Sequence, residues 1–269
     1  MSVVRELNHV AIRVACMEES LRLYKDLLGG KIIRDAKSPD GKSHFVYIQL
    51  AEGVIELIKG TPGADNLGFQ HIAFLTAKDK DINSATDAVR SRGYQITVEP
   101  KPAASGNGYL AFFKDIGGTT FEFIQRDEDI RIPGLENESI LEFDHISILV
   151  DDESINDTRE LITGPLGMKE RRIFEKPGTT MEYYRLGPDT IELLYGKGRP
   201  CPTQPIDHIA FRLPCVKEMH RYLVENGIAA TEPKESSLGG FFITSATGPD
   251  GEIIEFVDRS SLDEFGLFV

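Results

Sequence analysis

Asn8-His9-Val10-Ala11-Ile12-Arg13-Val14 is the stretch that decides the fold of this chain, because its pattern returns three times. Side chains alternate across a β-strand, so this run would place the imidazole of His9 on the face opposite the branched side chains of Val10, Ile12 and Val14. The other copies are Gln70-His71-Ile72-Ala73-Phe74, Asp144-His145-Ile146-Ser147-Ile148 and Asp207-His208-Ile209-Ala210-Phe211. Four of the chain's six histidines therefore occupy equivalent places.

Each histidine strand begins a module with the same order of predicted elements. Apolar residues at helical spacing, ended by glycine, predict helices over 18–28, 81–92, 155–166 and 216–225. Alternating apolar runs predict closing strands over 53–59, 119–125, 189–195 and 252–257. A repeat of roughly 65 residues decides the fold more firmly than local propensity does. It predicts an α+β protein of four βαβββ modules, paired so that two curved sheets face each other around a cleft with the helices outside.

The polar segment 126–143, which contains Pro133-Gly134, is the clearest linker and lies near the middle of the chain. We expect one domain over residues 1–128, with modules 1–60 and 68–128, and a second over 140–260, with modules 140–198 and 204–260. The sequence leaves open which modules share a cleft. The segment 260–269 is expected to dock on an apolar surface.

Composition limits the possible partners. The chain has 269 residues, 41% of them hydrophobic, and a net charge of -13 with a pI near 5.0. It can bury a substantial core, and its acidity argues against nucleic-acid and anionic-membrane partners. Three cysteines without a CxxC spacing favour a reducing, cytoplasmic setting, and neither a signal peptide nor an apolar run long enough for a membrane span is evident. We expect a soluble protein that binds a small-molecule substrate, with a homodimer as one option for its assembly.

Every closing strand carries a glutamate, and the His-to-Glu intervals are 47, 51, 47 and 47 residues. A single histidine or glutamate in a half-buried strand is usually a hydrogen-bonded or solvated residue. Four matched pairs instead favour metal binding, with two imidazoles and two carboxylates in each cleft. The predicted metal ligands are His9, Glu56, His71, Glu122, His145, Glu192, His208 and Glu255.

A mixed nitrogen and oxygen ligand set suits a divalent Ni, Zn, Mn, Fe or Co ion, whose charge two carboxylates balance. Four protein ligands leave a six-coordinate metal two positions for substrate oxygens, where it can act as a Lewis acid. A glutamate released from the metal can act as the base that moves a carbon-bound proton, and the candidates are Glu122, Glu56, Glu255 and Glu192. Arg13 and Arg212 share a face with their histidines, so each is predicted either to bind an anionic part of the substrate or to form an ordinary salt bridge.

With these residues the sequence resembles, over essentially its whole length, the vicinal oxygen chelate superfamily, which includes glyoxalase I, extradiol dioxygenases, methylmalonyl-CoA epimerase and bleomycin-resistance proteins. The resemblance implies two glyoxalase-like domains. His9, Glu56, His71 and Glu122 fall where glyoxalase I has its metal ligands, and Arg13 falls where it has an arginine for the glutathione carboxylate. Gly60 and the loop 105–108 lack the polar residue and the lysine of that glutathione site.

The resemblance leads to three hypotheses of function. The first is a divalent-metal-dependent, glyoxalase-I-like lyase or isomerase that acts on a 2-oxoaldehyde or a 2-hydroxy or 2-oxo acid by metal-stabilised enediolate proton transfer. The second is an extradiol dioxygenase, because His145, His208 and Glu255 match its iron ligands; Glu192 and the absence of a histidine at 194–196 depart from that family. The third is a bleomycin-resistance-like protein that binds a ligand without turnover.

Four further side chains are minor candidates for a place in the site. His44 is expected at a solvent-exposed strand edge, with a place in the cleft as the alternative. His220 is expected to be structural. Of the neighbours Tyr183 and Tyr184, one is expected in the core and the other at the surface.

Overall fold

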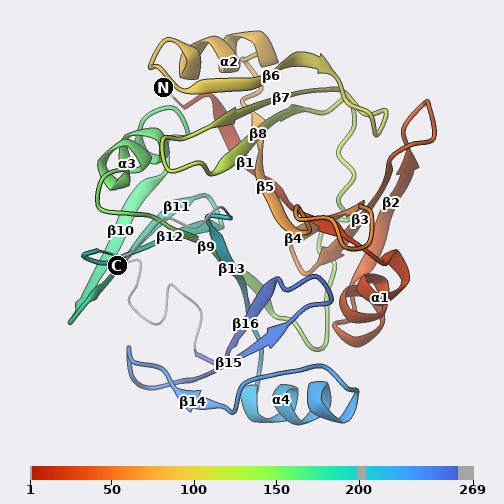
Figure 1. Cartoon of the computed structure of the whole chain (residues 1–269), viewed down its shortest axis with the longest axis vertical. Helices are drawn as coiled ribbons and strands as arrows, with labels where there is room; N and C mark the ends of the chain where they lie inside the picture. The colour runs from red at the N-terminus through yellow and green to blue at the C-terminus, as the bar shows by residue number, and fades with distance from the viewer. Residues whose placement is uncertain (1, 199–203, 260–269) are drawn as a thin grey trace.

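The structure, a computed structural model, describes residues 2–198 and 204–259 and contains two eight-stranded sheets, each built from two modules (Figure 1). The first sheet has the order β2-β3-β4-β1-β5-β8-β7-β6 and the second the order β10-β11-β12-β9-β13-β16-β15-β14. The α+β class and the βαβββ repeat are confirmed. The strands of the first sheet are β1 (Val4–Val14), β2 (Lys31–Lys37), β3 (His44–Leu50), β4 (Gly53–Lys59), β5 (Gly68–Thr76), β6 (Gln95–Pro102), β7 (Tyr109–Lys114) and β8 (Thr120–Gln125). Those of the second are β9 (Glu142–Leu149), β10 (Lys169–Lys176), β11 (Thr179–Leu186), β12 (Asp189–Tyr195), β13 (Ile206–Arg212), β14 (Lys234–Glu235), β15 (Phe242–Thr247) and β16 (Ile253–Val257).

The first strands of two modules join each pair. β1 runs antiparallel to β5, and β9 runs antiparallel to β13. The first module therefore pairs with the second and the third with the fourth. We expected two separate sheets facing each other, but each pair shares one continuous sheet, because β1 and β5 are hydrogen-bonded along most of their length. Three register shifts interrupt that ladder, and such bulges bend a sheet, which lets the eight strands curve around a cavity.

The helices pack against the face of each sheet that lies opposite the histidines. They are α1 (Met17–Leu21), continued by the π-helix η1 (Arg22–Leu27), then α2 (Ile82–Arg90), α3 (Ile155–Thr163) and α4 (Val216–Glu225). Buried residues of these helices share a core with Val10, Ile12 and Val14, as the alternation predicted, and Figure 1 shows the helices around the periphery. No helix in the described part of the chain is long and apolar enough to cross a membrane.

Two helices differ from the prediction, and one strand was not predicted. The helix predicted over 18–28 is α-helical only to Leu21 and then widens into η1. The helix predicted over 155–166 ends at Thr163, where the N–H of Gly164 still bonds the carbonyl of Glu160 but no longer continues the helix. β14 has only two residues, too few to produce a sequence pattern. The segment 260–269, for which docking was expected, lies outside the described residues.

The two halves are packed against each other through the backbone of β1. The N–H of Leu7 donates to Asp189 Oδ2 at 2.8 Å, and the N–H of Ala15, just past β1, donates to Asp250 Oδ1 at 2.9 Å. Asp189 begins β12 and Asp250 precedes β16, the two strands that carry glutamates of the second half. The strand that carries His9 is therefore held at both ends by carboxylates of the other half.

Candidate metal centres

The four candidate ligands of the first half come from the four central strands of its sheet. Ala11 on β1 lies opposite Glu56 on β4 and opposite His71 on β5. Ala73 on β5 lies opposite His9 on β1 and Glu122 on β8. Both alanines are fully buried. The register therefore brings the four ligands together around two small side chains that leave the space between them open.

The first cluster has the spacing that a bound cation requires. His9 Nε2 lies 3.3 Å from His71 Nε2, 3.1 Å from Glu122 Oε2 and 3.2 Å from Glu56 Oε2. Ligands held about 2.1 Å from one metal at right angles lie about 3 Å from each other. Glu122 Oε2 is buried and lies 3.1 Å from His9 Nε2 and 3.2 Å from His71 Nε2, the arrangement expected of three ligands around one cation. The donor set fits a divalent first-row metal.

The charges of the first cluster compensate each other in a buried place. Burial alone would raise the pKa of Glu122, but the imidazoles of His71 and His9 hold that pKa at about 2. Burial likewise raises the pKa of Glu56, and His9 again outweighs it, so that the pKa of Glu56 is lowered. Burial alone would lower the pKa of His9, whereas the charge of Glu56 raises it. Both carboxylates are therefore ionised at neutral pH and available to a cation.

A cavity of about 430 Å³ opens beside this cluster and carries two positively charged side chains. Arg13 lines it from β1 and Lys101 from β6, together with Glu56, His71 and Glu122. Arg13 Nε donates to the neutral amide oxygen of Gln70 at 3.2 Å. Within residues 2–198 and 204–259, neither cation forms an ion pair with a carboxylate. Arg13 and Lys101 therefore bring two positive charges that no described carboxylate pairs with into the cavity beside the cluster.

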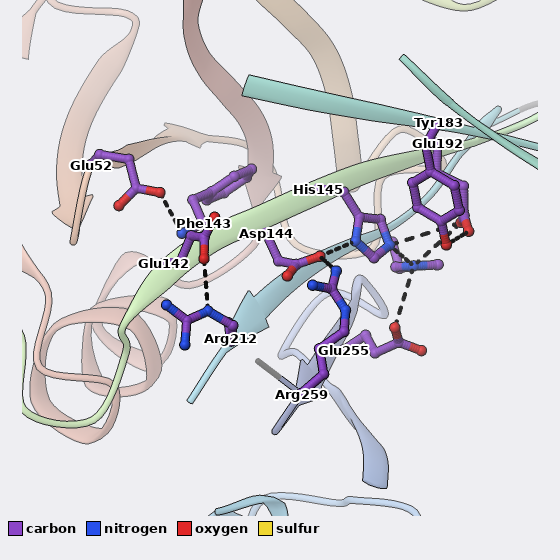
Figure 2. Close-up of polar contacts among 11 residues, drawn as sticks. Glu52, Glu142, Phe143, Asp144, His145, Tyr183, Glu192, Arg212, Glu255 and Arg259 are labelled. Carbon is purple, nitrogen blue, oxygen red and sulfur yellow. Dashed lines mark hydrogen bonds and ion pairs between the residues drawn. The ribbon is translucent and has the colours of Figure 1, made fainter. Parts of the chain in front are cut away.

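The second half repeats the cluster with a looser fourth residue. His145 Nε2 lies 3.1 Å from His208 Nε2 and 3.8 Å from Glu192 Oε2, and these three residues are buried. Glu255 Oε1 lies 4.0 Å from His208 Nε2, and the side chain of Glu255 is 20% exposed. A compact group of two imidazoles and one carboxylate results, with Glu255 reaching in from another side in Figure 2.

Tyr183 forms a hydrogen bond with one oxygen of the Glu192 carboxylate. Its hydroxyl donates to Glu192 Oε1 at 2.5 Å, and burial, followed by the charge of Glu192, raises the pKa of Tyr183 well above its usual value. The cavity beside this cluster measures about 180 Å³, less than half of the first. Burial would lower the pKa of His208, but its hydrogen bond to Asp207 and the charge of Glu255 raise that pKa to about 9. The second site therefore has less room for a ligand beside its metal-ligand candidates.

The remaining predicted residues lie elsewhere. Arg212 Nε donates to Glu142 Oε2 at 2.7 Å, a pair that Figure 2 shows apart from His145, and Arg212 does not line the second cavity. His44 pairs with Asp35 at the surface, at 2.7 Å, as the edge position predicted. His220 lies on α4, and its Nε2 is 3.6 Å from Glu232 Oε2, which lies beyond the end of that helix.

Tyr183 and Tyr184 are both buried, so the expectation that one of them is exposed was wrong. Both faces of β11 are covered: Tyr183 faces the cluster, and Tyr184 donates to the buried carboxylate of Glu182 at 2.8 Å. Tyr47 is the counterpart of Tyr183, since it lies opposite Glu56 as Tyr183 lies opposite Glu192. Sequence reasoning missed this role, although superposing the modules would have aligned the two tyrosines.

Comparisons with known proteins agree with the repeated architecture. Residues 6–123 match the family model described as Glyoxalase/Bleomycin resistance protein/Dioxygenase superfamily. A probable lactoylglutathione lyase from Synechocystis sp. is 34% identical over 126 residues, which is 44% of this chain and 94% of that protein. A putative lactoylglutathione lyase from Brassica oleracea var. gemmifera is 33% identical over 129 residues, 45% of each chain, so less than half of that plant protein is matched.

Solved structures share the fold over nearly the whole chain, among them the following two. The 2,3-dioxygenase LapB from Pseudomonas sp. KL28 gives a TM-score of 0.71 at 15% identity and covers 97% of this chain and 94% of its own. The Mn(II)-bound glyoxalase from Novosphingobium aromaticivorans gives a TM-score of 0.66 at 21% identity and covers 96% of this chain and 83% of its own. At these identities the likeness concerns the fold.

Proposed function

Because this chain belongs to the glyoxalase/bleomycin resistance/dioxygenase superfamily, we propose that it is a divalent-metal-dependent lyase or isomerase of the glyoxalase I type, with its reaction centre in the first half. The observation that carries the proposal is the convergence of His9, His71, Glu56 and Glu122 beside the larger cavity. The similarity to lactoylglutathione lyases over 126 to 129 residues, together with the family model that matches residues 6–123, supports it. We take the domains as residues 1–128 and 140–260.

His9, His71, Glu56 and Glu122 would hold the ion. A bound divalent metal supplies Lewis-acid polarisation of two neighbouring substrate oxygens. The substrate is accordingly a small oxygenated molecule, such as a 2-oxoaldehyde adduct or a 2-hydroxy or 2-oxo acid.

Arg13 and Lys101 bind the anionic end of the substrate. They line the same cavity as the cluster, and neither has a carboxylate partner in the described part of the chain. A substrate carboxylate placed between them would replace water around both cations. Phe45, Ile58 and Phe112 line the cavity between charged residues and exclude water from the reacting carbon.

Glu122 moves the proton. Its carboxylate lines the cavity and is ionised beside the imidazoles of His9 and His71, so that it can accept a proton. A carboxylate within the cavity can take a proton from one substrate carbon and return it to the neighbouring carbon. Tyr47, whose pKa burial and then the charge of Glu56 raise well above its usual value, keeps a protonated hydroxyl beside Glu56. That hydroxyl favours Glu56 as a fixed ligand and Glu122 as the mobile base.

The test combines reconstitution with one matched pair of variants. The purified full chain is loaded separately with Ni, Zn, Mn, Fe or Co and supplied with 2-oxoaldehydes, with and without glutathione. We expect metal-dependent turnover that falls at least 100-fold in Glu122→Gln and stays within threefold in Glu255→Gln, the equivalent change in the second half. Absence of metal-dependent turnover for all five ions, or equal losses in the two variants, would contradict the proposal.

A second candidate is an extradiol dioxygenase reaction in the second half. The group of His145, His208 and Glu192 is compatible with it, because two histidines and one carboxylate with open positions form the usual site of non-haem Fe(II) oxygenases; His9, His71 and Glu122 form the same kind of group in the first half. Oxygen consumption with catechols by the Fe(II)-loaded chain, lost in His208→Ala and retained in His71→Ala, would establish this reaction instead. A protein that binds its ligand equally well when all four cluster histidines are alanine would be a ligand-binding protein.

A further inference from the structure

Two arginines occupy the same place in the repeat and make the same contact. Arg126 follows Glu122 by four residues, and Arg259 follows Glu255 by four. Arg126 donates from Nε and Nη2 to Asn8 Oδ1, at 3.1 and 2.8 Å. Arg259 Nη2 donates to Asp144 Oδ1 at 2.5 Å, as Figure 2 shows. Each arginine thus reaches the residue that precedes the first histidine of its half.

The oxygen that accepts from each arginine also lies within hydrogen-bond distance of the following histidine. His9 Nδ1 lies 2.9 Å from Asn8 Oδ1, and His145 Nδ1 lies 2.6 Å from Asp144 Oδ1. A guanidinium only donates hydrogen bonds, so the side-chain atom that it contacts must be an acceptor, and the imidazole Nδ1 must therefore donate its hydrogen to that same oxygen. The other ring nitrogen, Nε2, is left to face the cluster. Asn8 and Asp144 are both buried, which keeps water from competing for these bonds.

The two copies differ in charge. In the first half the oxygen belongs to the neutral amide of Asn8. The residue before His71 is Gln70, whose side chain accepts from Arg13 and donates to backbone oxygens, so within the described residues it does not serve His71 in the same way. In the second half it belongs to the carboxylate of Asp144. His208 also has a carboxylate partner, since Asp207 Oδ2 lies 2.9 Å from its Nδ1.

We propose that Arg126 with Asn8 and Arg259 with Asp144 are positioning pairs that orient the imidazoles of His9 and His145, and that the carboxylates behind the imidazoles make the second half the tighter metal site of the two. The proposal rests on the metal clusters of the proposed function. A carboxylate that accepts from the far nitrogen of an imidazole makes the near nitrogen a stronger ligand, and losing such a partner typically costs 10- to 100-fold in metal affinity. Both sites have one arginine, so the second site has two more negative charges close to its imidazoles than the first. The first site, with fewer negative charges, would bind its metal less tightly and leave it a stronger Lewis acid, and it lies beside the larger of the two cavities. The second site would bind its metal more tightly and lies beside the smaller cavity. We therefore assign the reaction to the first site and a structural metal to the second.

Exchanging the two side chains tests the inference. Asn8→Asp is placed in a full chain whose second-half histidines are changed, His145→Ala and His208→Ala, and Asp144→Asn in a chain with His9→Ala and His71→Ala. Zn²⁺ affinity is measured by competition with a chromophoric chelator, and the Co²⁺ absorption spectrum reports whether the imidazoles bind. We expect the parent second site to bind Zn²⁺ at least 10-fold more tightly than the parent first site, Asn8→Asp to strengthen the first site about 10-fold, and Asp144→Asn to weaken the second 10- to 100-fold.

Arg126→Met provides the readout that separates positioning from general stability. It should weaken Zn²⁺ binding at the first site and alter the Co²⁺ spectrum while the melting temperature of the metal-free chain changes little, whereas loss of the fold would lower that temperature as well. If Asp144→Asn fails to fold, the comparison of the two parents and Asn8→Asp still decide. Equal Zn²⁺ affinities of the two parents, or an Asn8→Asp site no tighter than its parent, would overturn the inference. If the second site binds Zn²⁺ more tightly than the first but no substrate is turned over, the inference about the positioning pairs stands and the proposed function is refuted. If the chain binds no metal, both the inference and the proposed function are refuted.

Discussion

Asp189 should make this protein lose stability as the pH rises from acid to neutral. This carboxyl is partly buried where the two halves meet and accepts the N–H of Leu7 at 2.8 Å. Burial, opposed by that hydrogen bond and by the charge of Arg131, raises its pKa from 3.8 to about 7. The folded protein therefore keeps the proton over a pH range in which the unfolded chain has already released it.

The sign and the size follow from this difference. A carboxyl whose pKa is higher in the folded state does not lower the free energy of unfolding below pH ~4. It lowers that free energy increasingly between pH ~4 and pH ~7, and by the full amount at higher pH. A shift of about 3 units corresponds to at most about 4 kcal/mol, of which about 2 kcal/mol develops between pH 5.5 and pH 8. Asp189→Asn keeps an oxygen for the N–H of Leu7 but has no proton to release, so its stability advantage over the parent should grow by about 2 kcal/mol over that interval.

Urea unfolding at pH 5.5 and pH 8, followed by circular dichroism, measures the two free energies of unfolding. Asp79→Asn is the matched control, because the side chain of Asp79 is 74% exposed. Its effect should be the same at both pH values. An Asp189→Asn variant whose advantage does not change with pH, or that is less stable than the parent at pH 8, would show that Asp189 is already ionised in the fold and refute the reasoning.

Three further outcomes are expected. Tyr24→Phe removes a buried hydrogen bond of 2.8 Å to Glu252, which links the halves, and should lower the free energy of unfolding by about 1–3 kcal/mol in urea titrations; an unchanged value would contradict it. Gly53→Ala would place a Cβ 2.3 Å from Cδ2 of Phe143 and should cost about 1–3 kcal/mol in the same assay, and an unchanged free energy of unfolding would contradict it. Arg13→Met should raise the KM for an anionic substrate more than it lowers kcat, and an unchanged KM in steady-state kinetics would show that the anion binds elsewhere.

The repeat made most of the fold and the position of the clusters predictable. A histidine in the first strand and a glutamate in the last lie on neighbouring parallel strands, β1 with β4 and β5 with β8. Each module therefore brings its own pair together, whatever the loops between them. The joining of modules into one continuous sheet was not predictable in the same way, because it depends on the edge that β1 offers to β5, and a periodic pattern records which face is buried and not which edge is paired.

Arg13 and Arg212 show that a local sequence pattern does not determine the contact partner of a charged side chain. Arg13 and Arg212 have the same distance from their histidines, and the sequence offered both the same two roles. Arg212 lies opposite Glu142 in the β13–β9 register and pairs with it, while Arg13 lies opposite Gly68 in the β1–β5 register and has no acid there. The role of each cation is decided by a residue far away in the sequence, which only the strand register brings close.

The same reasoning explains why the halves should not behave as independent domains. The backbone of β1, which carries His9 and Arg13, is held at one end by Asp189 and just past the other by Asp250. Movement of β12 or β16 on metal binding in the second half would therefore shift the first-half imidazole, because Asp189 at the start of β12 and Asp250 in the turn before β16 are hydrogen-bonded to β1 and to the residue that follows it. If the second half holds its metal tightly, that metal also fixes the strand on which the first half's reaction depends. Removing the second metal altogether, by changing both His145 and His208 to alanine, should then lower activity at the first site by more than the threefold allowed for Glu255→Gln, even though the first site keeps all four of its ligands.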